Sequence, residues 1–130
     1  MRDDNSRSQA RGASSVKVLV VDDDRLIRKM ARAVLEEEGH ECLEAGTPAE
    51  ALRLLREARP DVCFLDYILP DMDGLSLLRN YSAGATEGRA RIFLLTGSEG
   101  DHLLEQARKS GAEGILRKPF DPETLLAKLR

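Results

Sequence analysis

The feature that most limits the fold is a series of five short apolar runs, separated by stretches with the period of an α-helix. Four of the runs are rich in Val, Ile, Leu and Phe without alternating polar residues, which is typical of parallel strands covered on both faces. The run at 41–45 is the most polar, so we expect it at an edge of the sheet. The runs lie at 16–21, 41–45, 62–65, 92–95 and 114–116.

Each run is followed by signals for a helix. Asp24 is a suitable N-cap for a helix that Gly39 ends, and "TPAE" has the form of a capping box, with Thr47 as the cap, Pro48 at the first position and Glu50 reaching back. Further helices are expected from "DGLSLLRNY", from "SEGD" and from "DPETLLAKLR", the last running to the end of the sequence. Strands that alternate with helices predict an α/β protein with a parallel sheet and helices on both faces.

The composition fits one domain of 130 residues. A net charge of −3 gives no reason to expect direct binding of nucleic acid. No apolar run approaches the roughly 18 residues that a membrane span needs. The polar segment 1–15 lacks the apolar centre of a secretory signal, and we expect it to be a disordered tail. Cys42 and Cys63 each lie in an apolar run and are interpreted as small buried side chains in a reducing, cytoplasmic setting.

Polar side chains stand where four of the apolar runs end. In parallel α/β sheets, ligands bind outside the carboxyl ends of the strands. Five groups are therefore expected to converge there: Asp22, Asp23, Asp66, Thr96 and Lys118. Clustered carboxylates without Cys or His favour a hard divalent cation, with Mg²⁺ preferred and Mn²⁺ as an alternative. A metal beside a carboxylate, a hydroxyl and an ammonium suits phosphoryl transfer.

Taken singly, each of these residues has a simpler explanation. An Asp after a strand is usually a turn or cap residue, and Asp24, Asp71 and Asp73 are interpreted in this way. His40 and His102 lie outside the strand ends and are interpreted as structural or surface residues. The site hypothesis rests on the combination, because groups at the same position of successive strand–helix units would otherwise require several coincidences.

The sequence resembles the receiver domain of two-component response regulators over residues 16–130. The resemblance lies in four motifs that have the family's order and spacing: "LVVDDD", "LDYILPDMDG", "LLTG" and "RKPF". It implies a flavodoxin-like (βα)5 three-layer sandwich, whose five parallel strands have the order 2-1-3-4-5. It also implies that the peptide bond between Lys118 and Pro119 is cis.

The resemblance gives the acidic residues separate roles. Asp66 matches the aspartate that accepts a phosphoryl group and contacts the metal. Asp23 matches the direct carboxylate ligand of Mg²⁺, and Asp22 the acid that acts through a metal-bound water. The backbone carbonyl of Ile68 matches a further metal ligand.

The resemblance also names the switch residues and shows two departures. Thr96 matches the switch hydroxyl, and Lys118 the lysine that contacts the phosphoryl group. Ile115 stands where the family often has an aromatic switch residue, so this allosteric position is expected to work differently. Ile68 stands where many relatives have a polar side chain, which leaves the lifetime of the phosphorylated form open.

The implied function is a signalling switch. A sensor histidine kinase or a histidine phosphotransfer protein would donate the phosphoryl group to Asp66. The domain would catalyse its own phosphorylation and dephosphorylation, without turnover on an external substrate. Partner binding would then change on the face formed by the helix that begins at 98–101, the strand 114–116 and the helix from 121. An output domain or protein, or a phosphorylation-dependent homodimer, would respond. The uncapped last helix favours a fragment of a longer protein, although a single-domain regulator stays open.

Three rival functions were weighed against the switch. An aspartyl-phosphate phosphohydrolase needs an acid two residues after its nucleophile, and Ile68 cannot act as one. In an FMN-binding module, the phosphate would meet the repelling charges of Asp22, Asp23 and Asp24. An interaction module that is never phosphorylated stays open, although the complete set of acidic residues, Thr96 and Lys118 count against it.

Overall fold

The computed structural model describes residues 15–84, 89–97 and 101–130. Its strands form one parallel sheet with the order β2-β1-β3-β4-β5, as the resemblance implied. The polar run is an edge strand, as predicted. The strands are β1 (Lys17–Val21), β2 (Glu41–Ala45), β3 (Val62–Asp66), β4 (Arg91–Thr96) and β5 (Gly114–Arg117).

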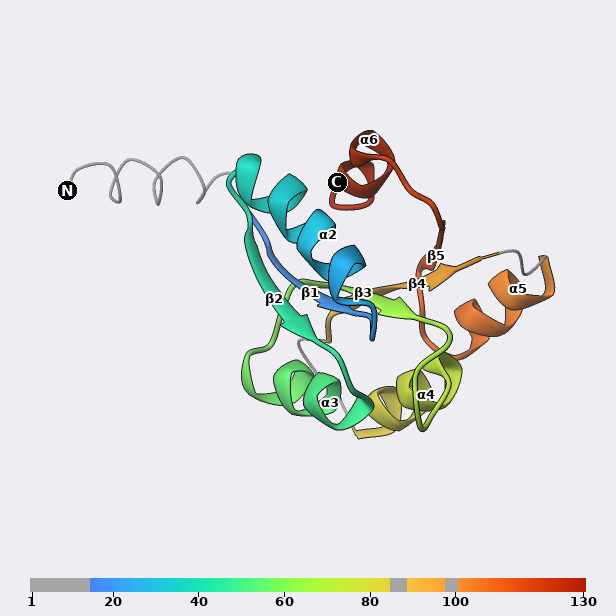
Figure 1. Cartoon of the computed structure of the whole chain (residues 1–130). Coiled ribbons are helices and arrows are strands. Elements are labelled where there is room, and N and C mark those ends of the chain that lie inside the picture. The colour runs from blue at the N-terminus through green and yellow to red at the C-terminus, as the bar shows by residue number, and fades with distance from the viewer. Residues whose placement is uncertain (1–14, 85–88, 98–100) are drawn as a thin grey trace.

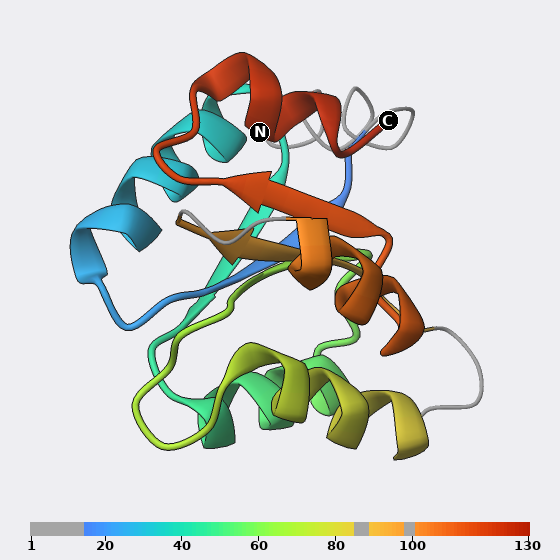
Figure 2. The ribbon, with the colours of Figure 1, turned by 90° about the vertical axis from the view of Figure 1, so that its right-hand side faces the viewer.

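Helices cover both faces of this sheet and give three layers (Figure 1). α2 and α6 lie on one face, and α3, α4 and α5 lie on the other, as the turned view also shows (Figure 2). Within the described residues, no helix has the length and apolar character that a membrane crossing requires. The helices are α2 (Arg25–Glu37), α3 (Pro48–Glu57), α4 (Gly74–Gly84), α5 (Asp101–Lys109) and α6 (Pro122–Ala127).

The buried apolar side chains form two clusters, one on each face of the sheet. Neighbouring residues of a strand enter opposite clusters, as Leu94 and Leu95 do on β4. Since both faces are covered, the inner positions of the central strands are apolar and the polar residues stand at the strand ends, which explains the unbroken runs in the sequence. Cys42 and Cys63 are buried free cysteines, as predicted. Burial raises the pKa of the Cys42 thiol to about 12.

The predicted helix ends are largely confirmed. The side chain of Asp24 accepts a hydrogen bond from the Leu26 N–H, and that of Thr47 accepts one from the Glu50 N–H. Gly39 has a φ of 88°, which favours glycine. The Glu50 carboxylate accepts from the N–H of Gly46, the residue before the cap, and so reaches one residue further back than a capping box requires.

The last helix is shorter than predicted. α6 ends at Ala127. The next hydrogen bonds join residues three apart, from the Lys128 N–H to the Leu125 carbonyl and from the Leu129 N–H to the Leu126 carbonyl. The guanidinium of Arg91, at the start of β4, donates to the carbonyls of residues 128, 129 and 130. This contact offers the final carbonyls a partner outside the helix, which a pattern along one segment could not reveal.

Two predictions fall on segments that the structure does not describe. The tail predicted for residues 1–15 lies outside the described residues except for its last member, and the expected cap around 98–100 lies outside them as well. The peptide bond between Lys118 and Pro119 is cis, as the resemblance implied.

Candidate functional site

The carboxyl ends of β1, β3 and β4 and the segment after β5 enclose a pocket of about 450 Å³. The structure thus brings together all of the predicted site residues except one. Ile115 lies elsewhere on β5, where its partly buried side chain packs against the cluster under α3, α4 and α5. The pocket is lined by Asp22, Asp23, Asp24, Asp66, Tyr67, Ile68, Thr96, Gly97 and Lys118.

Asp66 ends β3, and its carboxylate is almost buried, with 6% of the residue exposed. Its Oδ1 accepts a hydrogen bond from the Ile68 N–H at 3.3 Å, and its Oδ2 accepts one from the Lys118 ammonium at 3.2 Å. Burial, followed by the negative charge of Asp22, raises the pKa of Asp66 to about 6, although Lys118 and the Ile68 N–H act in the opposite direction. The site therefore holds an acid whose charge is poorly compensated.

Asp22 directly follows β1 and lies inside the protein, with no exposed surface. Its Oδ1 accepts a hydrogen bond from the Asp24 N–H at 2.9 Å, and its Oδ2 lies 2.7 Å from the Lys118 Nζ. Lys118 thus bridges Asp22 and Asp66. Burial lowers the pKa of Lys118, but the two carboxylates outweigh burial and the pKa is raised. The lysine is therefore fully charged at neutral pH.

The three carboxylates have the separation that a shared metal ion needs. Oxygen atoms of Asp22, Asp23 and Asp66 all lie within 4.8 Å of one another. The buried Oδ2 of Asp22 lies 2.7 Å from the Lys118 Nζ but accepts no hydrogen bond from the described residues. This oxygen can therefore still bind a metal ion. Three carboxylates and one ammonium leave two negative charges when all are ionised. This donor set fits a hard divalent cation such as Mg²⁺.

Thr96 and Lys118 are positioned by the far half of the sheet. Thr96 ends β4 and is 1% exposed. Its backbone carbonyl accepts a hydrogen bond from the Lys118 N–H at 2.7 Å. This bond ties the segment after β5 to β4, so that the lysine side chain enters the pocket beside β3.

Sequence reasoning missed three contributors to this site. Gly74 lies against the backbone of Asp66, since a Cβ at residue 74 would lie 2.5 Å from the Asp66 carbonyl oxygen. Arg28 donates to the backbone carbonyl of Asp22, and Glu44 binds Arg28. The glycine in "PDMDG" was visible as a helix start. The pairing of residues 28 and 44 carries no signal in either segment alone.

A sequence model of the family described as response regulator receiver domain matches residues 18–130. The chain belongs to this family. PhoB, the phosphate regulon transcriptional regulatory protein of Pseudomonas aeruginosa, is 34% identical over 113 residues, covering 87% of this chain and 49% of that protein. MtrA of Mycobacterium tuberculosis H37Rv, named a DNA-binding response regulator, is 35% identical over 114 residues, covering 88% and 49%. The receiver chain spans about half the length of these relatives.

The fold of the receiver chain has solved counterparts. The chemotaxis protein CheY4 of Vibrio cholerae matches with a TM-score of 0.82 and 35% identity, covering 88% of this chain and 96% of that one. The receiver domain of the Francisella response regulator 1452 matches with a TM-score of 0.80 and 30% identity, covering 88% and 93%. The order of the strands and the position of the pocket at their carboxyl ends are therefore those of a two-component receiver.

Proposed function

We propose that this receiver domain is a phosphorylation-dependent switch and that Asp66 is its phosphoryl acceptor. The observation that carries the proposal is the Asp66 carboxylate itself, which lines the pocket beside an ammonium and two further carboxylates. In the reaction, an oxygen of Asp66 attacks the phosphorus atom. The proposed donor is a phosphohistidine side chain of another protein. The bond from phosphorus to its imidazole nitrogen breaks, and that nitrogen takes up a proton.

The other residues of the pocket have supporting roles in this proposal. Asp23, Asp66 and the backbone carbonyl of Ile68 would hold Mg²⁺ or Mn²⁺, and Asp22 would contact the ion through water. When bound, the ion supplies positive charge that offsets the charge of the phosphoryl oxygens. Lys118 donates a hydrogen bond to one of those oxygens. Thr96 donates its hydroxyl to another after phosphorylation.

A protein is the proposed donor of the phosphoryl group. Three large apolar side chains are exposed in the described part of the chain, and two of them lie on α2 while the third lines the pocket: Leu26 (67%), Met30 (47%) and Ile68 (66%). Exposed apolar side chains on α2 and at the charged pocket suit docking of another protein. We propose a sensor histidine kinase or a histidine phosphotransfer protein, which this domain meets in the cytoplasm.

The proposed output surface is formed by α5, β5 and α6. A hollow of about 370 Å³ lies there, between β5 and the start of α6. Since Thr96 and Lys118 belong to the elements that border this surface, their movement toward a phosphoryl group would repack it. A downstream output domain, a separate target protein or a second phosphorylated copy is the proposed reader of that change.

Mass spectrometry of the intact protein tests the acceptor. After incubation with acetyl phosphate and Mg²⁺, we expect the wild-type chain to gain one phosphoryl group. Asp66→Asn should gain none, and Asp71→Asn, at an exposed aspartate of the following loop, is the matched control and should gain one. Labelling of Asp66→Asn to the wild-type level would refute the assignment. No labelling of any variant would favour the interaction module that is never phosphorylated.

A further inference from the structure

We infer that Arg28 is a positioning residue for the acidic pocket: its guanidinium holds the peptide that joins Asp22 to Asp23, and Glu44 holds the guanidinium. Arg28 lies in the first turn of α2, and Glu44 lies on the edge strand β2. Among the described residues, neither lines the pocket. The inference rests on the proposed metal site and extends it to residues that do not touch the ion.

The two contacts of Arg28 use different nitrogen atoms of the same planar group. Its Nη1 donates to the backbone carbonyl of Asp22 at 2.8 Å, and its Nε donates to the Glu44 Oε1 at 3.0 Å. Because the guanidinium fork is rigid, fixing one edge orients the other. The group also lies close to the chain after β2, since a Cβ at Gly46 would be 3.1 Å from the Nη1. Arg28 has little freedom to leave the carbonyl.

The carbonyl of Asp22 is an effective point of control. The Asp22 N–H donates to the Ala45 carbonyl at 3.1 Å, its Oδ1 accepts from the Asp24 N–H, and its Oδ2 lies 2.7 Å from the Lys118 Nζ. The peptide that follows is planar, so the direction of the carbonyl fixes the plane that leads to Asp23. The Asp23 side chain is exposed and depends on this plane for its position beside Asp22 and Asp66.

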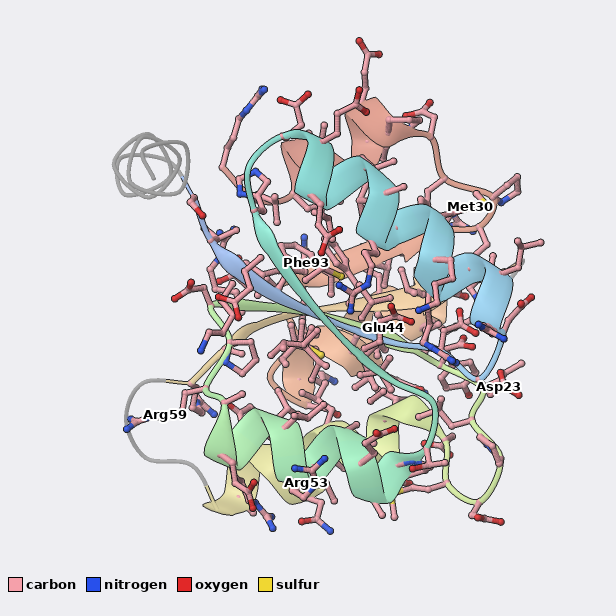
Figure 3. All side chains as sticks on the ribbon, turned by 60° about the vertical axis from the view of Figure 1, so that its left-hand side comes forward. Asp23, Met30, Glu44, Arg53, Arg59 and Phe93 are labelled. Carbon is pink, nitrogen blue, oxygen red and sulfur yellow. The ribbon has the colours of Figure 1, made fainter. Side chains whose placement is uncertain are left out.

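Glu44 fixes Arg28 through an unusually strong cluster of charges. Its side chain is 11% exposed and contacts Arg28, Lys29 at 2.9 Å and Arg32 at 2.5 Å. Burial alone would raise the pKa of Glu44, but the hydrogen bonds from these three cations lower it to about 2. Figure 3 shows Glu44 on β2 beside α2, and Asp23 near the start of that helix. Glu44 is therefore a permanent anion that holds Arg28 in place.

A positioning role and a simple charge effect make opposite predictions for metal affinity. Arg28 is a cation near a cation site, so its removal would tighten Mg²⁺ binding if only its charge mattered. If Arg28 positions the peptide, its removal weakens binding. Arg32→Ala is the matched control, because Arg32 binds the same Glu44 carboxylate but, among the described residues, forms no hydrogen bond or ion pair with Asp22.

A Mg²⁺ titration at constant ionic strength, followed by amide chemical shifts, separates these cases. We expect Arg28→Ala to weaken binding by about tenfold, within the range for partners behind the metal ligands. Arg32→Ala should bind as the wild type does or slightly more tightly. Arg28→Lys keeps the charge and loses the fork, so it should remain weak. Equal or tighter binding in both Arg28 variants would overturn the inference.

Hydrogen exchange without metal gives a second reading that does not need the proposed function. In EDTA, the Asp24 amide should exchange faster in Arg28→Ala than in the wild type, because the turn that its bond to Asp22 closes is loosened. Arg32→Ala should leave that exchange rate unchanged. If the wild type bound no Mg²⁺, the proposed metal site would fail, while equal exchange rates in Arg28→Ala and the wild type would overturn the role of Arg28. If Arg28→Ala does not fold, Arg28→Lys carries both measurements.

Discussion

At the scale of the residue, the buried carboxylate of Asp66 lowers the stability of the folded chain at neutral pH. Asp66 has a pKa of about 6 in the folded chain and an ordinary value of 3.8. The folded state therefore binds more protons than the unfolded state between these values, and stability falls as the pH rises through them. Above pH 6 the cost of the ionised carboxylate is fully present. Lys118 compensates this charge only in part, which supports the proposed binding of a metal ion and a phosphoryl group there.

Asp66→Asn should therefore stabilise the metal-free protein at neutral pH, because it removes the buried charge and keeps the shape. We expect the free energy of unfolding at pH 7.5 to rise by roughly 1 to 3 kcal/mol. The gain should shrink toward zero near pH 4, where the wild-type acid is protonated. Urea unfolding in EDTA at both pH values measures this. If the variant is less stable than the wild type at pH 7.5, the ionised Asp66 carboxylate does not destabilise the folded protein.

At the scale of the element, the loop from β3 to α4 depends on a close backbone contact. The Gly74 N–H donates to the Tyr67 carbonyl at 2.6 Å, and a Cβ at residue 74 would lie 2.5 Å from the Asp66 carbonyl oxygen. Backbone cannot give way as a flexible side chain does. Gly74→Ala should therefore shift the end of β3 and the carboxylate that it carries.

We expect Gly74→Ala to lower the free energy of unfolding by roughly 1 to 3 kcal/mol. Gly84→Ala, at the end of the same helix, is the control, since a Cβ there would only reach the Arg56 side chain at 3.9 Å. Thermal unfolding of both variants, with acetyl phosphate labelling at a temperature where both are folded, measures the two effects. Equal stability and labelling in Gly74→Ala and Gly84→Ala would mean that the loop adapts.

The elements themselves were largely readable from the sequence, and their partnerships were less so. The buried strands could be predicted because both faces of the sheet are covered, which requires unbroken apolar runs. Asp24 and Thr47 marked the starts of two helices because each accepts a local hydrogen bond. The early end of α6 was missed, and the carbonyls of residues 128, 129 and 130 after the helix accept hydrogen bonds from Arg91, which a pattern along one segment does not show. The contact between Arg28 and Asp22 was missed because it depends on how α2 lies over the end of β1.

A change at Ile115 on β5 tests whether this side chain carries the signal to the proposed output surface or whether other contacts carry it. Ile115 packs among apolar side chains and has neither a ring nor a hydroxyl to exchange for another contact. We expect Ile115→Ala to keep the distant chemical-shift changes that phosphorylation or its analogue causes on α5 and α6. The comparison is made with the wild type in amide spectra with and without beryllofluoride. Loss of the distant changes in Ile115→Ala would identify this side chain as their carrier.

At the scale of the whole molecule, metal binding should raise the stability of the folded chain. A ligand that binds only the folded state stabilises it by about 2.7 kcal/mol at one hundred times its dissociation constant. We expect saturating Mg²⁺ to raise the unfolding temperature of the wild type and to have little effect on Asp23→Asn. Asp22→Asn should show a smaller loss of affinity. Scans in Mg²⁺ and in EDTA test this, and an equal effect on wild type and both variants would place the ion elsewhere.

We propose that the pocket binds a phosphoryl group at Asp66 and that the surface formed by α5, β5 and α6 responds. Amide chemical shifts of the wild type, recorded with Mg²⁺ before and after addition of beryllofluoride, test both halves in one measurement. We expect changes at Asp66, Thr96 and Lys118 and further changes along β5 and α6, with none in Asp66→Asn. Changes confined to the pocket would contradict the switch, and the absence of any change at Asp66 would contradict the phosphoryl site.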